Sequence, residues 1–98
     1  MNIDEAVRDI EGQVMEEIDG VKSYISCFMK WKDSDKDVAK IYLDIATQEL
    51  EHAKKIHNIL ATLVPKATPE QVYLIRFMQH LNAEQIQGVT TMLSMNKI

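Results

Sequence analysis

The sequence is poor in the residues that form disulfides, tight turns and basic binding surfaces. Its 98 residues include one cysteine, two prolines and three glycines, with fifteen acidic residues against eleven lysines and arginines. Because Cys27 has no partner for an internal disulfide, we expect a reducing, cytoplasmic setting. The net charge of -4 disfavours a nucleic-acid binder, since that class is usually basic. No apolar run approaches the roughly 20 residues of a membrane span, and the acidic residues 1–5 do not resemble a secretory signal.

Helical periodicity runs through most of the chain. Apolar residues recur at steps of three and four from about residue 3 to 32 and from about 36 to 63, which predicts two long helices. Only three residues separate these stretches, so we expect the helices to form an antiparallel hairpin. The fold class is therefore all-α, and the length fits a single domain. Within it we expect a helical hairpin in residues 1–63 and a C-terminal helical segment in residues 64–98.

Capping residues mark the ends of these two helices. Asn2 followed by Glu5 predicts the start of the first helix. Ser34 followed by Asp37 predicts the start of the second. Pro65 is expected to end it, because the residue before a proline avoids helical backbone angles.

The C-terminal segment opens with a further start signal. Thr68 and Gln71, with a proline between them, predict a capped helix over about residues 69–81. Asn82 could begin a second cap, so we expect the chain to break there and a last helix to run over about residues 83–95.

Both long helices carry ionisable residues on stripes that otherwise are apolar. The first stripe is Ile3, Val7, Ile10, Val14, Glu17, Val21, Tyr24, Phe28 and Trp31. The second is Val38, Tyr42, Ile45, Glu49, His52, Ile56, Ile59 and Leu63. Glu49 and His52 are three residues apart and therefore lie on one helix face. A carboxylate and an imidazole on a buried stripe need partners, and a metal ion would satisfy both.

The hairpin is expected to bring Glu17 beside that pair. Glu17 lies 15 residues before Lys32, and Glu49 lies 14 residues after Asp35. At 1.5 Å per residue, both carboxylates are about 21–23 Å from the turn. The three ionisable residues should therefore share one height and one inward face. Gly20 lies at the same level, where the close approach of another helix would favour glycine.

Two carboxylates and one imidazole are too few ligands for a closed metal site. The hairpin also has an apolar face that it cannot cover alone, and a two-fold homodimer would solve both problems. It would form a four-helix bundle holding four Glu and two His, the ligand set of di-iron carboxylate proteins. Oxygen-rich donors with one imidazole per metal favour iron or manganese and tolerate zinc. Tyr24, also inward, is positioned to hydrogen-bond a ligand carboxylate.

These segments resemble the encapsulated ferritins, half-size ferritin-like proteins in which each chain supplies one Glu and one Glu-x-x-His. The resemblance covers about residues 10–63 and rests on three segments: Val14-Met15-Glu16-Glu17, Tyr24 and Glu49-Leu50-Glu51-His52-Ala53. It implies that Glu17 is a terminal iron ligand, Glu49 a carboxylate bridging two irons, and His52 a nitrogen ligand. Tyr24 would lie just outside these ligands.

The resemblance also implies an activity and partners. Glu17, Glu49 and His52 would be the catalytic residues of a ferroxidase that oxidises Fe(II) to Fe(III) with oxygen or peroxide, with two irons at each dimer interface. The dimers can close into rings, and the family depends on a separate encapsulin cage. Residues 91–98 do not resemble the tag that directs cargo to such a cage.

Other readings of the same residues stay open. Glu17, Glu49 and His52 could form a buried polar network in a non-catalytic helical interaction protein. A phosphotransfer histidine is disfavoured because His52 is predicted to face inward.

Several other motifs are assigned no site. A calcium loop at the turn is disfavoured because Val38 stands where that loop needs glycine. His80 and Glu84 are interpreted as surface residues, and His57 as a boundary residue. The methionines at 78, 92 and 95 are interpreted as core or subunit contacts.

Overall fold

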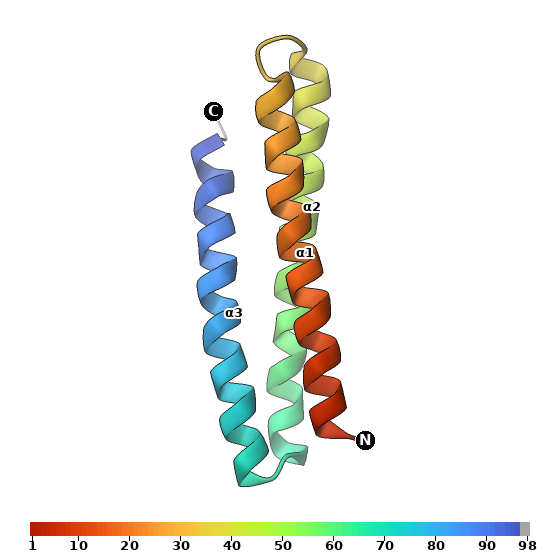
Figure 1. Ribbon diagram of the computed structural model, residues 1–98, viewed down its shortest axis with the longest axis vertical. Helices are drawn as coiled ribbons and strands as arrows, with labels where there is room; N and C mark the ends of the chain where they lie inside the picture. The colour runs from red at the N-terminus through yellow and green to blue at the C-terminus, as the bar shows by residue number, and fades with distance from the viewer. Residues whose placement is uncertain (97–98) are drawn as a thin grey trace.

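The computed structural model describes residues 1–96 and is all-helical over that range (Figure 1). Helices α1 (Ile3–Trp31) and α2 (Lys36–Leu63) are followed by a short 3₁₀ turn, η1 (Val64–Lys66), and by α3 (Pro69–Asn96). Residues 91–98 are predicted not to be a cage-targeting tag, and the last two residues of that segment lie outside the described range. No helix within it is both long and apolar enough to cross a membrane.

The two long helices begin and end close to where their sequence signals predict. The Asn2 side chain accepts a hydrogen bond from the Glu5 amide at 3.0 Å, which confirms the first cap. The cap of α2 was predicted one residue too early. Asp35, in extended backbone, accepts from the Val38 amide at 3.1 Å. The Ser34 hydroxyl instead donates to the Trp31 carbonyl, because Ser34 still belongs to the end of the preceding turn.

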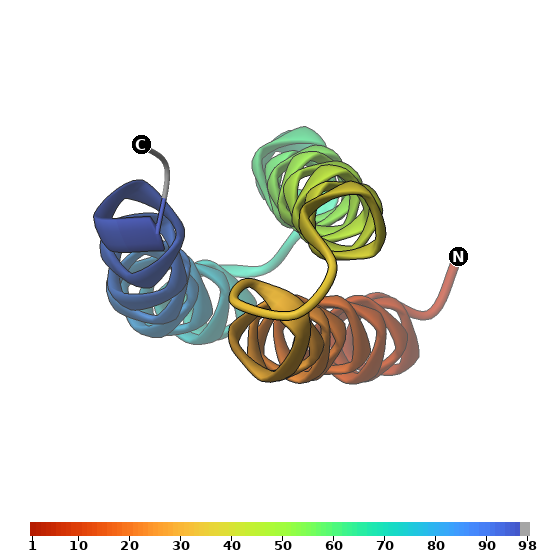
Figure 2. The same ribbon diagram turned by 90° about the horizontal axis from the view of Figure 1, so that it is seen from above.

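The three helices form an elongated bundle of 54 × 20 × 14 Å. Helices α1 and α2 pack antiparallel along their whole length, as predicted, and α3 runs back beside them (Figure 1). Seen along its length, the bundle places the helices at the corners of a triangle (Figure 2). Helix α3 thus covers one face of the α1–α2 hairpin and leaves the opposite face open.

The buried stripe of α2 lies mostly one residue along from the predicted one, whereas α1 departs from its predicted stripe only from the level of the site onward. The predicted α1 positions that are buried are Ile3, Val7, Ile10, Val14 and Val21. On α1 the buried residues continue from Val14 to Ile18, rather than to Glu17. On α2 they include Leu50 and Ala53, rather than Glu49 and His52. One residue along a helix is a rotation of about 100°. Helix α3 packs on one side of the hairpin and the residues that face it are buried. At the level of the site, the predicted stripe positions therefore lie at the edge of the core.

Helix α3 is continuous through Asn82, so the predicted break is wrong. A complete capping box starts the helix: the Thr68 hydroxyl accepts from the Gln71 amide, and the Gln71 side chain accepts from the Thr68 amide. Asn82 does not cap, because it is buried and its side-chain amide donates to the Glu11 carboxylate of α1. This bond fixes α3 against α1 at mid-length.

Candidate metal centre

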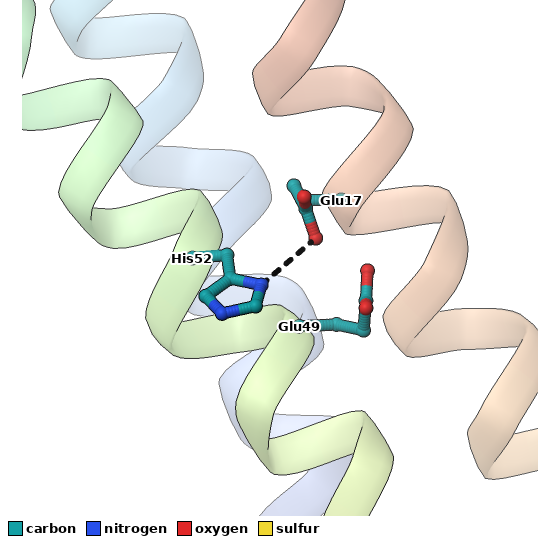
Figure 3. A group of neighbouring side chains, drawn as sticks. All are labelled: Glu17, Glu49 and His52. Atoms are coloured by element: carbon teal, nitrogen blue, oxygen red, sulfur yellow. Dashed lines mark ion pairs between the residues drawn. The ribbon is translucent and has the colours of Figure 1, made fainter.

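Glu17, Glu49 and His52 meet between α1 and α2, as the hairpin geometry predicts (Figure 3). One ligand atom from each of the three lies within 4.8 Å of the others. His52 Nδ1 is 3.7 Å from Glu17 Oε2. Of residues 1–96, no other three His, Cys, Asp or Glu side chains gather in this way. The aspartates of the α1–α2 turn therefore form no second cluster.

A glycine on α1 makes room for one of the ligands. A Cβ atom added to Gly20 would lie 2.7 Å from Glu49 Oε2 and 3.3 Å from its Cδ. Real Cβ atoms do not approach other heavy atoms that closely, so alanine here would displace the carboxylate. By contrast, a Cβ on Gly12 of the same helix would meet nothing within 4 Å. The close approach at Gly20 is thus made by the Glu49 side chain of α2, a residue of the site itself.

The three side chains differ in their access to solvent. Glu17 and Glu49 are half-buried, and the Glu17 side chain is 24% exposed, whereas that of His52 is 55% exposed. The prediction that His52 faces inward is therefore wrong for the single chain. In Figure 3, α3 passes behind α2, on the far side of the site, and Figure 2 shows it on one side of the α1–α2 pair. The cluster therefore opens on the face of the hairpin that α3 leaves uncovered, which we call the open face.

Crowding of the two carboxylates changes the acidity of one of them. The neighbouring Glu17 raises the pKa of Glu49 above its usual value of 4.5, first through a side-chain hydrogen bond that favours the protonated form. Burial and repulsion between the two carboxylates raise it further, and His52 opposes the change. Glu17 Oε2 is itself buried and has no hydrogen-bond partner. This buried oxygen therefore accepts no hydrogen bond, and the His52 imidazole at 3.7 Å is the ion-pair partner beside it.

A divalent cation fits this donor set. Two carboxylates and an imidazole suit iron, manganese or zinc, and a cation would satisfy the Glu17 oxygen that accepts no hydrogen bond. Metal–ligand bonds of about 2.1 Å put opposite ligands of one ion about 4.2 Å apart. The observed spread of 4.8 Å therefore needs only a small closure. His52 is the most exposed of the three side chains.

Tyr24 does not contact the ligands in the predicted way. Its ring stacks on that of Tyr42 from α2, with centroids 6.2 Å apart. Among the hydrogen bonds of residues 1–96, none joins the Tyr24 hydroxyl to Glu17 or Glu49. The two tyrosines instead pack against each other between α1 and α2, on the side of the site nearer the turn. Tyr42 could have been anticipated, because it occupies the matching stripe position on α2.

The remaining histidines are not part of the site. His57 is half-buried, as expected of a boundary residue, and its Nδ1 has no hydrogen-bond partner. His80 is exposed on α3 and lies 3.1 Å from Glu84, which confirms that both are surface residues.

Comparisons with known proteins add no assignment. No family model matches the chain, and neither a curated protein nor a solved structure matches it.

Proposed function

We propose that this chain is a ferritin-like iron-binding protein whose site is completed by a second copy and oxidises Fe(II). The observation that carries the proposal is the convergence of Glu17, Glu49 and His52 from two helices around a buried carboxylate oxygen that accepts no hydrogen bond. Such a group is costly to bury unless it is paired or binds a metal. The resemblance of residues 10–63 to the encapsulated ferritins supports the same assignment.

The open face argues for a second copy as the missing part. Large exposed apolar side chains stand whole turns away from the site residues, which puts them on the same helix faces. Ile41, 11 residues before His52, is 59% exposed, Ile59, seven after it, is 43% exposed, and Trp31, 14 residues after Glu17, is 37% exposed. Ile45 and Ile56 are half-buried between them. Three protein ligands leave an ion with open positions, and a two-fold axis beside the cluster would bring a second set. The product is a four-helix bundle with four Glu and two His at its centre.

Iron is the metal that we propose, with manganese or zinc as alternatives. Carboxylate-rich sites with one imidazole per metal suit iron and manganese, and two-fold symmetry supplies ligands for two ions. By the resemblance, Glu17 would be a terminal ligand and Glu49 would bridge the ions, while His52 supplies nitrogen. A carboxylate that binds metal is deprotonated, and the pKa of Glu49 is raised, so metal affinity should increase as pH rises through that pKa.

The proposed reaction is a balanced two-electron oxidation. Two Fe(II) ions are the substrates and each loses one electron. Dioxygen accepts both electrons together with two protons, and hydrogen peroxide forms. The role of the chain's own residues is to hold the two ions close together and to supply carboxylate charge, which favours Fe(III) over Fe(II). An encapsulin cage, and a location inside it, are proposed on the resemblance alone.

A non-catalytic interaction protein is the second candidate. The raised pKa of Glu49 favours it, because a protonated Glu49 bonded to Glu17 lets the pair exist without a cation. In that case the cluster would set the register of a helical dimer. Metal content separates the two candidates.

The test is iron stoichiometry in separated oligomers. Protein loaded with Fe(II) without oxygen would be fractionated by size, and iron and protein measured in each fraction. We expect about one iron per chain, only in the dimer or larger species, and its loss in His52→Ala. His80→Ala, which removes an exposed histidine of α3, is the matched control. Helical oligomers without iron would refute the metal site and leave the interaction protein.

Oxidation kinetics then test catalysis. Fe(II) consumption under oxygen would be compared for wild type, Glu17→Gln and Glu16→Gln, because Glu16 is the exposed neighbour of Glu17. Only in Glu17→Gln should the rate of Fe(II) oxidation fall to that of Fe(II) in buffer without protein. Wild-type protein that binds iron yet oxidises it at the buffer rate would show that the site is structural.

A further inference from the structure

Helix α3 has two apolar faces, and only one of them contacts the rest of the chain. Ile75, Val89 and Leu93 are buried against α1 and α2. The opposite face, which we call the outer face of α3, presents apolar side chains to solvent at helical spacing: Tyr73 (83% exposed), Phe77 (57%), Leu81 (38%), Met92 (38%) and Met95 (78%). An exposed apolar stripe of this length marks an interaction surface.

Charge is nearly absent from this helix. Helix α1 contains ten charged residues and α2 contains eight, whereas α3 contains only Glu70, Arg76 and Glu84. From residue 85 to 96 there is none. Helices that lie on membrane surfaces are usually rich in Lys and Arg, and so are nucleic-acid contacts. The outer face is therefore suited to a neutral, apolar protein surface.

We propose that this surface is the outer face of α3 in a second copy, paired antiparallel about a two-fold axis near residues 84 and 85. In that register Tyr73 lies opposite Met95 of the other copy, Phe77 opposite Met92, and Leu81 opposite Gly88. Because of the two-fold symmetry, each of these contacts occurs twice, once on each side of the axis.

The order of side chains along the stripe is what selects a second copy. Its aromatic residues stand at the N-terminal end and its methionines at the C-terminal end, so the antiparallel pairing brings each aromatic ring against a methionine sulfur. Open space surrounds the Cα of Gly88, which accommodates the larger Leu81. A parallel pairing would place Gly88 against Gly88 and leave a gap.

The one charged pair on the stripe is compatible with this arrangement. Glu84 lies near the proposed axis, and His80 of the same chain is 3.1 Å away. Each copy thus brings its own counter-charge when His80 is protonated. The next residue, Gln85, is uncharged and would face Glu84 of the other copy, so it can donate a hydrogen bond to it.

The contact is expected to be weak by itself. A 28-residue helix is about 42 Å long, and two aromatic rings cover roughly 150–250 Å² each. One helix face therefore falls below the about 800 Å² per partner of a stable interface. The open face with the candidate metal centre is a different surface, on the other side of the hairpin from α3 (Figure 3). Two separate self-pairing faces would join copies into assemblies larger than a dimer.

Disulfide trapping tests both the partner and the register. The background would be Cys27→Ser with His52→Ala, which removes the native thiol and the metal-dependent contact. Glu84→Cys should cross-link to itself, because the two positions meet at the axis. Tyr73→Cys should not, because its two copies would lie about 35 Å apart. A mixture of Tyr73→Cys and Met95→Cys chains should cross-link to each other.

Lys22→Cys, on the exposed face of α1, is the control for random collision. Self-linking of Tyr73→Cys would overturn the antiparallel register. If Glu84→Cys forms no more dimer than Lys22→Cys, the face does not pair with itself and the proposal fails. Phe77→Glu placed in the Glu84→Cys chain should reduce trapping at least fivefold, and unchanged trapping would equally refute the outer face as the contact.

Discussion

Replacing Gly20 by alanine should move helix stability and metal affinity in opposite directions. Alanine is favoured over glycine in a helix interior by about 1 kcal/mol, so the metal-free protein should gain from the change. Part of that gain is lost because the new Cβ would lie 2.7 Å from Glu49 Oε2. The clashing atom is the end of a flexible side chain, which can turn away. We expect a net stabilisation between zero and about 1 kcal/mol.

The same movement takes a carboxylate out of the candidate metal centre. Its oxygen must shift by several tenths of an ångström to reach ordinary contact with a Cβ. Changes that misorient a metal ligand typically lower affinity 10- to 100-fold, and we expect a loss of about that size for Fe(II). Gly12→Ala is the matched control, because its Cβ would meet nothing within 4 Å. It should give the full stabilisation of about 1 kcal/mol and leave affinity unchanged.

The assay is thermal unfolding of metal-free protein together with Fe(II) titration under anaerobic conditions. A gain of 1 kcal/mol raises Tm by about 4–8 °C in a domain of this size. Equal iron affinity in Gly20→Ala and Gly12→Ala would refute the argument that the space at Gly20 positions Glu49 for metal. A Gly20→Ala protein that unfolds before wild type would show instead that the backbone, and not the carboxylate, has to move.

Three further predictions concern single interactions. Glu49→Gln should raise the free energy of unfolding of the metal-free protein at pH 7, and this difference from wild type should narrow toward pH 4.5. Because the pKa of Glu49 is raised in the folded protein, the stability that its protonated form contributes is complete below the pKa of the unfolded chain and is lost as pH rises through the pKa of the folded protein. Urea unfolding across this pH range measures the difference. Asn82→Ala should cost about 1–3 kcal/mol in chemical denaturation, since it removes a buried donor and leaves Glu11 without its partner, whereas no loss would mean that the bond does not hold α3. Asp35→Ala should lower the free energy of unfolding by about 1 kcal/mol and Ser34→Ala should leave it almost unchanged, because only Asp35 caps α2. A larger effect of Ser34→Ala in thermal unfolding would show that Ser34 is the cap after all, as the sequence predicts.

Local chemistry was sufficient to predict the two helices of the hairpin, the start of α3 and the height of the site. Caps at Asn2 and Thr68 and the stop at Pro65 act within a few residues, so they can be read from the sequence. The meeting of Glu17 with Glu49 and His52 follows from the short turn and the fixed rise of a helix. Both predictions depend only on neighbours along the chain and on standard helix geometry.

Tertiary packing decided the rest. At the level of the site, the side on which α3 docks decides whether the predicted stripe position or its neighbour one residue on is buried. For that reason Ile18 and Leu50 are in the core, while His52 lies on the open face. Asn82 carries a helix-breaking signal, but its bond to Glu11, 71 positions away in the sequence, keeps α3 continuous. The sequence by itself determined which residues meet, and the third helix determined which side of them faces solvent.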